Sequence, residues 1–276
     1  MKKSKRKRKK NGGFRWLVFS FAIFCLWLFS TFTLKTTEVE IKSEKIKDEI
    51  TVVQITDLHG SDFGMNNSFI LNKIVKAEPD FVVITGDMYT RGSEEGKNTA
   101  LKLMSKIGEN YNTYFVNGEH DNEEDFIAEL KKNNINVLDY KSEDITIGET
   151  DIRLYGITNV YYSPTFDLKN EFILDDSRYN ILLAHISNKE AFASFGMDLC
   201  ICGDTHGGQV RLPFIGGLYG TNGWLPEVIE KDVFIKGSYK YENTDFFISS
   251  GLGNYPIPLR FMNRPEIAVI KLVPEK

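Results

Sequence analysis

The chain shows two kinds of hydrophobic pattern along its length. One long uninterrupted apolar stretch comes first, and from residue 50 onward short apolar runs alternate with segments of helical spacing. Short apolar runs bounded by polar or glycine-containing turns are typical of buried strands, and they occur at 50–56, 81–85 and 113–116. Apolar residues at helical spacing follow each run and predict helices that end before Pro79, over about 97–108 and over about 123–133.

The second half of the chain is richer in strands. Further apolar runs predict strands at 135–140, 144–149, 151–157, 180–186, 198–204, 246–252 and 266–272. Strand and helix units followed by a strand-rich half predict two stacked sheets flanked by helices. Polar residues at the carboxyl ends of buried strands converge on one rim of such a fold, so we expect ligands to bind there.

The long apolar stretch runs from Leu17 to Leu34, eighteen residues without a charge. This is close to the length that a helix needs to cross a bilayer core. Phe14 and Trp16 stand at its start, where aromatic rings favour the membrane interface. The alternative is a cleaved signal peptide, but such a peptide has a shorter apolar region and a small-x-small cleavage site, for which residues 30–34 give only a weak match. We therefore predict an uncleaved transmembrane anchor at residues 16–34.

Charge asymmetry around this segment predicts its orientation. Residues 1–15 hold nine Lys and Arg and no acid, so the positive-inside rule keeps this basic arm in the cytoplasm and places the rest of the chain outside. A basic tract can instead be a nucleic-acid patch or a nuclear signal. The remainder of the chain carries 25 basic and 38 acidic residues, so we expect no nucleic-acid partner.

These patterns divide the chain into four parts. They are the cytoplasmic arm 1–15, the single-pass anchor 16–34, a polar linker 35–48 and one globular domain 49–276. Weak alternation along 35–48 leaves an edge strand open as an alternative for the linker. The glycine- and aromatic-rich segment Gly207–Trp224 is expected either at the mouth of a site or as a long surface loop.

The chain has four histidines, and each one follows an apolar run next to carboxylates or glycines. The sites are Asp57-Leu58-His59, Gly118-Glu119-His120-Asp121, Ala184-His185 and Gly203-Asp204-Thr205-His206, with Asp87 in a similar place in Thr85-Gly86-Asp87. A single histidine is more often a structural residue than a ligand. Because all four repeat one context, they indicate a site, and imidazole with carboxylate suits Zn, Mn, Fe or Co.

Taken in order, these blocks resemble the calcineurin-like metallophosphoesterase family. That family has Asp-x-His, Gly-Asp, Gly-Asn-His-Asp/Glu, a lone His after a strand, and Gly-His-x-His, and the resemblance covers about residues 49–273. The block Thr205–Gln209 and the tail 250–272 are similar to the small membrane-associated bacterial branch. The resemblance implies a four-layer α/β/β/α sandwich, here preceded by one transmembrane helix.

The resemblance also implies a site with two divalent metal ions. Asp57, His59 and His206 would hold the first metal, and Asp87 would bridge to the second, which His185 would also bind. His120 would lie just outside the metals, as a proton donor to the leaving oxygen or as a transition-state stabiliser. We add the hypothesis that Asp121 orients His120.

Two positions depart from the family pattern, and both fall on ligands of the second metal. Glu119 stands where the family has Asn, and Asp204 stands where it has His. Each replaces one metal-binding side chain with another, which favours a retuned site over a dead one. Four carboxylates would cancel the charge of two divalent cations, so we predict a preference for Mn²⁺, with Mg, Fe or Zn as alternatives.

The predicted function is hydrolysis of a phosphodiester, phosphomonoester or pyrophosphate by attack of a bridging hydroxide at the dinuclear site. A location at the membrane surface favours a lipid-linked or cell-envelope substrate. The competing hypothesis is a membrane-tethered binding or scaffold protein that keeps a degenerate metal site. A zinc peptidase is disfavoured because the sequence has no His-Glu-x-x-His motif.

Overall fold

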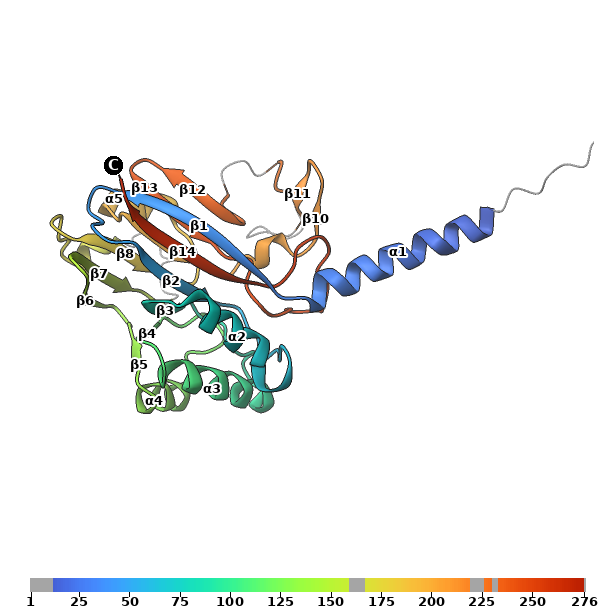
Figure 1. Cartoon of the computed structure of the whole chain (residues 1–276), viewed down its shortest axis with the longest axis horizontal. Helices are drawn as coiled ribbons and strands as arrows, with labels where there is room; N and C mark the ends of the chain where they lie inside the picture. The colour runs from blue at the N-terminus through green and yellow to red at the C-terminus, as the bar shows by residue number, and fades with distance from the viewer. Residues whose placement is uncertain (1–11, 159–166, 219–225, 230–232, 276) are drawn as a thin grey trace, which may run out of the picture.

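Two six-stranded sheets stacked face to face form the body of the molecule (Figure 1). The computed structural model describes residues 12–158, 167–218, 226–229 and 233–275. The first sheet has the strand order β1 (Lys35–Ser43), β14 (Glu266–Pro274), β2 (Ile50–Ile55), β3 (Phe81–Ile84), β4 (Thr113–Phe115) and β5 (Ile135–Val137). Strands β2 to β5 are parallel, and β14 runs antiparallel to β2.

The second sheet has the strand order β12 (Gly237–Tyr241), β13 (Thr244–Ile248), β9 (Leu199–Cys202), β8 (Tyr179–Leu183), β7 (Thr150–Gly156) and β6 (Lys141–Ile147). Its four central strands are parallel, and both edge strands pair antiparallel to their neighbours. The carboxyl ends of the central strands of both sheets carry the loops that hold the histidines.

Helices cover the outer face of each sheet. The helices α2 (Ser68–Ala77), α3 (Glu94–Gly108) and α4 (Glu124–Lys132) pack on the first sheet, and α5 (Lys189–Phe195) with the short helix η3 (Leu168–Asn170) packs on the second. Ser93 caps α3 by accepting a hydrogen bond from the Gly96 N–H, and Glu94 and Glu95 fill the first turn.

Three hydrophobic cores fill the spaces between these four layers. Alternate residues of one strand enter different cores: Val52 of β2 packs between the sheets, whereas Val53 faces the helices. A third core lies between the second sheet and α5. Strands buried on both faces are continuously apolar, which is the pattern the sequence shows, and the predicted α/β/β/α sandwich is confirmed.

The segment predicted as a linker is mostly a strand. Residues 35–43 form β1, which pairs along all nine residues with β14 at the edge of the first sheet. Ile41 is buried, and the Thr37 hydroxyl donates to Glu266 at 2.7 Å. The weak alternation of this segment therefore reflects an edge strand with one face against the core. Only residues 44–49 connect β1 to β2.

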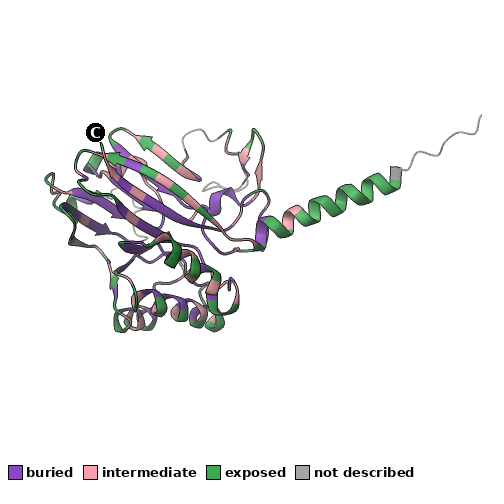
Figure 2. Cartoon of the chain, viewed as in Figure 1, coloured by how far each residue is buried: buried purple, intermediate pink, exposed green. Residues whose placement is uncertain are grey.

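Helix α1 (Gly12–Phe32) extends away from the body (Figure 1). Residues 13–32 are long and apolar enough to cross a membrane, judged by length and composition. The helix is exposed along most of its length, and its last turn meets the body, where Ser30 and Thr31 are buried (Figure 2). An apolar helix that is exposed along most of its length is a candidate membrane span.

The packing of the core between the two sheets can be tested by substitution. Ile181 of β8 is fully buried there, whereas Ile173 is 87% exposed. Ile181→Ala is expected to lower the free energy of unfolding by about 2–5 kcal/mol, because it deletes buried methyl groups and leaves a cavity. The matched Ile173→Ala variant should change it by less than about 0.5 kcal/mol. Urea unfolding followed by far-UV circular dichroism measures both, and equal losses would contradict the layer assignment.

A candidate metal centre at the strand ends

The histidines and aspartates singled out in the sequence gather at the carboxyl ends of strands from both sheets. Asp57 and His59 follow β2, Asp87 follows β3, and His120 lies in the loop after β4. His185 follows β8, and Asp204 and His206 follow β9. Parallel strands end at one edge of a sheet, and the two sheets present their edges together, so residues far apart in the sequence become neighbours.

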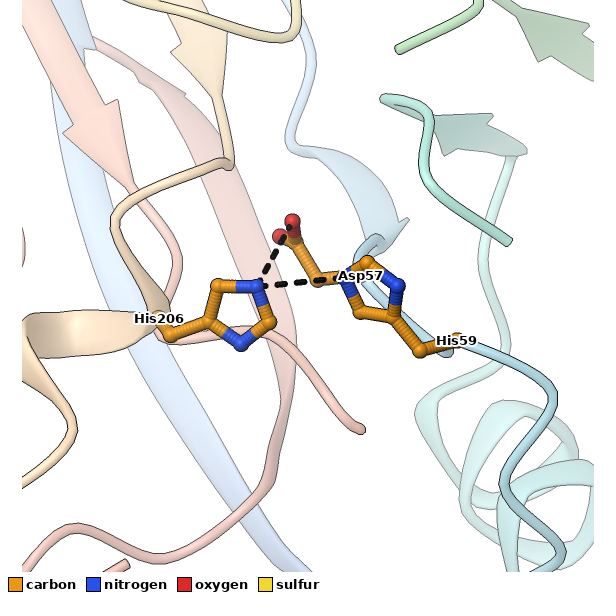
Figure 3. Close-up of side chains that lie close together, drawn as sticks. All are labelled: Asp57, His59 and His206. Atoms are coloured by element: carbon orange, nitrogen blue, oxygen red, sulfur yellow. Dashed lines mark hydrogen bonds and ion pairs between the residues drawn. The ribbon is translucent and has the colours of Figure 1, made fainter. Parts of the chain in front are cut away.

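The first group consists of Asp57, His59 and His206, whose ligand atoms all lie within 4.8 Å of one another. Figure 3 shows the two rings facing each other beside the Asp57 carboxylate. His59 Nε2 lies 3.2 Å from His206 Nε2, which in turn lies 3.6 Å from Asp57 Oδ1. Two ring nitrogens and a carboxylate that point at one space are a suitable ligand set for a divalent metal.

A second group shares Asp57 with the first and adds Asp87 and His185. His185 Nε2 lies 3.4 Å from Asp87 Oδ2 and 3.9 Å from Asp57 Oδ1. The other ring nitrogen of His185 lies 2.7 Å from the Thr85 carbonyl oxygen. A proton on Nδ1 satisfies that carbonyl and leaves the Nε2 lone pair free to bind a metal. Among the described residues, this buried Nε2 has no hydrogen-bond partner.

A third group joins His59 and Asp87 to His120. His59 Nε2 is 3.8 Å from Asp87 Oδ2, and the His120 main-chain N–H donates to Asp87 Oδ1 at 3.0 Å. The three groups therefore overlap, with Asp57, His59 and Asp87 each shared by two of them. The described residues therefore offer overlapping candidate ligand groups at one place.

The backbone that carries these side chains is in an unusual conformation. Five site residues other than glycine have positive φ: Asp57, His59, Asp87, Asp204 and His206. Each such residue costs free energy, and residues of this kind concentrate at functional sites. The surrounding hydrogen bonds hold the strained loops, as in the bonds from the Asp57 N–H to the Gly86 carbonyl and from the His59 N–H to the Asp87 carbonyl.

Burial dominates the protonation of the site. It raises the pKa of Asp57 to about 7 and lowers the pKa of His59 to about 3. Burial also lowers the pKa of His206 well below its usual value. His185 and Asp87 are exceptions: although burial opposes both charges, their mutual attraction raises the pKa of His185 and lowers that of Asp87. Bound cations favour carboxylates in the charged form and imidazoles in the neutral form, so they would suit most of this set.

The two departures from the family pattern lie in different surroundings. Asp204 Oδ1 is 3.7 Å from His185 Nε2, next to the second group. Glu119 is exposed and belongs to none of the three groups. Burial raises the pKa of Asp204, and the nearby charge of Glu119 raises it further. Asp204 is therefore adjacent to the centre, whereas Glu119 lies at its outer edge.

Within the described residues, the Asp121 carboxylate is bonded to neighbouring loops and not to His120, so its role as an orienter of His120 stays a prediction. Its buried carboxylate accepts hydrogen bonds from the Met88 N–H at 2.8 Å and from the Gly118 N–H at 2.7 Å. In the described part of the chain, no hydrogen bond joins it to His120. Instead, the Arg91 N–H donates to His120 Nδ1 at 3.3 Å. Asp121 thus fixes the loops after β3 and β4 to each other, which sets the position of Asp87.

The sequence analysis missed two residues at the site, Arg91 and Tyr255. The Tyr255 ring stacks on His59 and meets His120 edge-on, with centroids 4.7 Å apart in both cases. The Arg91 guanidinium donates to the Glu119 carbonyl and to Asn122. Both residues lie in irregular loops. In the sequence, only the neighbouring Gly86-Asp87 and Pro256 could have drawn attention to these positions. In the segment Gly207–Trp224, positions 219–224 lie outside the described residues.

Glycine is required where two loops approach Asp57. Gly251 has a φ of +63°, and a Cβ atom there would lie 2.6 Å from Asp57 Cβ. A Cβ on Gly203 would lie 2.6 Å from Asp57 Oδ2. Side chains at either position would displace the carboxylate, so these glycines are part of the construction of the site.

The fold is an α/β/β/α sandwich with a candidate metal centre at its strand ends, and comparison with known proteins assigns the family. The sequence profile of the calcineurin-like phosphoesterases matches residues 50–208, more than half of the chain. The chain belongs to the calcineurin-like phosphoesterase family, and the predicted resemblance is confirmed. The family uses divalent metals, which agrees with the candidate ligand groups.

Several bacterial proteins are similar to the chain over most of its length. An uncharacterized metallophosphoesterase of Helicobacter pylori is 28% identical over 87% of this chain, which spans 64% of that protein. The metallophosphoesterase YkuE of Bacillus subtilis, also uncharacterized, is 28% identical, with 87% of this chain and 85% of YkuE covered. The phosphodiesterase YaeI of Escherichia coli is 25% identical, with 80% of this chain and 82% of YaeI covered.

Substitution of Gly251 tests whether the loops hold Asp57 as described. Gly251→Ala and Gly237→Ala both place alanine at positive φ, but a Cβ at Gly237 has nothing within 4 Å. Each is expected to lose about 1–2 kcal/mol of stability from backbone strain. Only Gly251→Ala should also weaken metal binding, because it pushes Asp57 aside. Isothermal titration with Mn²⁺ measures this difference, and equal affinities in the two variants would contradict the description.

Proposed function

We propose that the chain hydrolyses a phosphodiester, phosphomonoester or pyrophosphate, lipid-linked or from the cell envelope, at a centre of two divalent metal ions. The observation that carries this proposal is the overlap of the three ligand groups through Asp57, His59 and Asp87. A second cation in an adjacent position needs shared ligands of this kind. Asp57, His59 and His206 are assigned to the first metal, and Asp87 is assigned to both.

The second metal is assigned to His185 and Asp87, with Asp204 and Glu119 as further carboxylates. Support comes from the buried His185 Nε2, which is directed at Asp87 and Asp204 at 3.4 and 3.7 Å. Metals bound here would supply a water molecule of lowered pKa and neutralise charge on the phosphoryl oxygens. Carboxylate-rich ligation supports Mn²⁺ as the preferred ion.

His120 is the proposed proton donor to the leaving oxygen. Because its Nδ1 accepts a hydrogen bond from the Arg91 N–H, the neutral ring carries its proton on Nε2. Tyr255 packs against the ring and restricts its rotation. The Arg91 guanidinium beside the Glu119 carbonyl adds positive charge at the edge of the site, where it would attract an anionic phosphoester.

We further propose that α1 is the membrane anchor, with the arm 1–15 in the cytoplasm and the hydrolase domain outside. The apolar composition of residues 13–32 and the nine basic residues of the arm 1–15 support this arrangement. A substrate held in or near the membrane then encounters the site at the surface.

The metal requirement is tested with the full chain purified in detergent and bis-p-nitrophenyl phosphate as substrate. Hydrolysis should stop after chelation and return with Mn²⁺. Asp87→Asn should lower kcat/KM by at least about 100-fold, because several kcal/mol of transition-state charge stabilisation are lost. The control Asp151→Asn changes an exposed aspartate of β7 and should leave the rate unchanged. Activity that survives both chelation and Asp87→Asn would rule out the mechanism.

Metal preference is tested by restoring the family residues one at a time. Asp204→His should shift the preference from Mn²⁺ toward Zn²⁺, because imidazole replaces a carboxylate 3.7 Å from His185. Glu119→Asn should shift it less, since Glu119 is exposed outside the three groups. The ratio of kcat/KM with the two metals is the measurement. An unchanged ratio in the double variant would show that these carboxylates do not tune the site.

A further inference from the structure

The C-terminal end of α1 is hydrogen-bonded to the body. The Trp27 indole N–H donates to the Pro258 carbonyl at 3.1 Å, and the Thr31 hydroxyl donates to the Arg260 carbonyl at 3.1 Å. The Met262 N–H donates back to the Ser30 hydroxyl at 2.9 Å. Three side chains of one helix end thus contact one loop, residues 255–264, which fixes the helix relative to that loop.

The same loop reaches the metal-ligand groups. Its first residue, Tyr255, stacks on His59 and meets the edge of the His120 ring at a steep angle. The Asn263 side-chain amide donates to the His206 carbonyl at 2.7 Å. The fully buried Arg260 donates to the Ser250 and Gly253 carbonyls at 2.7 Å, which ties the loop to the segment that packs on Asp57. The helix end and the site are therefore joined through one continuous set of contacts.

A small hairpin extends this region on the side of the body from which α1 emerges (Figure 1). It consists of β10 (Arg211–Leu212) and β11 (Gly216–Gly217). The Arg211 N–H donates to the Phe261 carbonyl at 2.9 Å, which joins the hairpin to the loop 255–264. The Val228 N–H donates to the Ile215 carbonyl at 3.1 Å, which places residues 226–229 beside the hairpin tip.

Exposed apolar side chains concentrate on these loops. Beyond α1, eleven large hydrophobic residues in the described part of the chain are exposed, and seven of them lie here. One is Tyr255, and we call the other six the interfacial surface: Phe214, Ile215, Val228, Ile229, Ile257 and Met262. Phe214 is fully exposed at the hairpin tip. Exposed apolar residues gathered in one region mark a surface that contacts a partner or a membrane.

The charges of this region differ from one segment to the next. Residues 205–218 and 251–265 contain no Asp or Glu, although acids outnumber bases across the chain after residue 15. Glu227, between the two parts of the surface, pairs with Arg211 at 2.9 Å. The third segment, which carries Val228 and Ile229, holds the acids Glu227, Glu230 and Asp232 and one base, Lys231. The apolar side chains, and not the charges, are therefore what suits this surface to a bilayer.

We infer that the interfacial surface inserts into the lipid bilayer beside α1 and holds the metal centre at the level of the headgroups. The inference rests on the proposed role of α1 as the membrane anchor. The bonds from Trp27, Ser30 and Thr31 set the distance of the body from the membrane, so the surface and the helix enter the same bilayer. A phosphoester at headgroup depth then reaches Tyr255, His59 and His120 without leaving the membrane.

Site-specific depth measurement on the full chain tests this inference. Cys25 is exposed in α1 and is replaced by Cys25→Ser, whereas Cys200 and Cys202 are buried. In this background Phe214→Cys, Ile257→Cys and the control Ile173→Cys each supply one exposed thiol for an environment-sensitive fluorophore. The control is matched, since Ile173 is 87% exposed and lies outside the interfacial surface. The proteins are reconstituted in phosphatidylethanolamine and phosphatidylglycerol vesicles with or without nitroxide-labelled acyl chains.

The fluorophore at positions 214 and 257 should emit at shorter wavelength and lose intensity in vesicles that contain the nitroxide lipid, whereas the fluorophore at 173 should do neither. Quenching at 214 and 257 no greater than at 173 would overturn the inference. A blue shift without nitroxide quenching would also overturn it, because protein and not lipid would then cover the surface. Protection of Cys200 and Cys202 from labelling verifies the fold. The readout needs no catalysis, so a failure here is distinct from a failure of the proposed hydrolysis.

Discussion

Burying several carboxylates in one place is the physical constraint on which the rest of the structure depends. Asp57 and Asp87 lie inside the protein with Asp204 next to them, and such a cluster is unfavourable unless cations or hydrogen bonds compensate the charge. The surrounding loops hold that cluster in place. Asp121 joins two of these loops, and Gly203 and Gly251 let the chain pass close to Asp57. Positive φ at five site residues is the conformational cost of directing these side chains inward.

The parts of the fold that depend on local pattern were predictable from the sequence. The strands predicted at 50–56 and 81–85 are continuously apolar because cores lie on both of their faces, and each ends one residue before the predicted end. The gathering of Asp57, Asp87 and His185 was predictable for the same reason, since each follows a buried strand at its carboxyl end. The metal role of each side chain, and of Glu119 and Asp204, stays a prediction.

The parts that depend on tertiary contacts were not predictable. Strand β1 has few apolar residues, because one face of an edge strand meets solvent, and its partner β14 lies at the other end of the sequence. Tyr255 reaches His59 only because the loop 255–264 folds across the site. Asp121 stands beside His120 in sequence, but its buried carboxylate is directed at main-chain N–H groups of two loops. Adjacency in sequence therefore did not indicate the hydrogen-bond partners of Asp121.

The central claim is that one set of overlapping ligands holds two divalent cations. Anomalous X-ray scattering from crystals of the chain grown with Mn²⁺ tests it most directly. Our account predicts two anomalous peaks, one in contact with Asp57, His59 and His206 and one in contact with His185, with Asp87 touching both. A single peak, or peaks that lie away from these side chains, would contradict it.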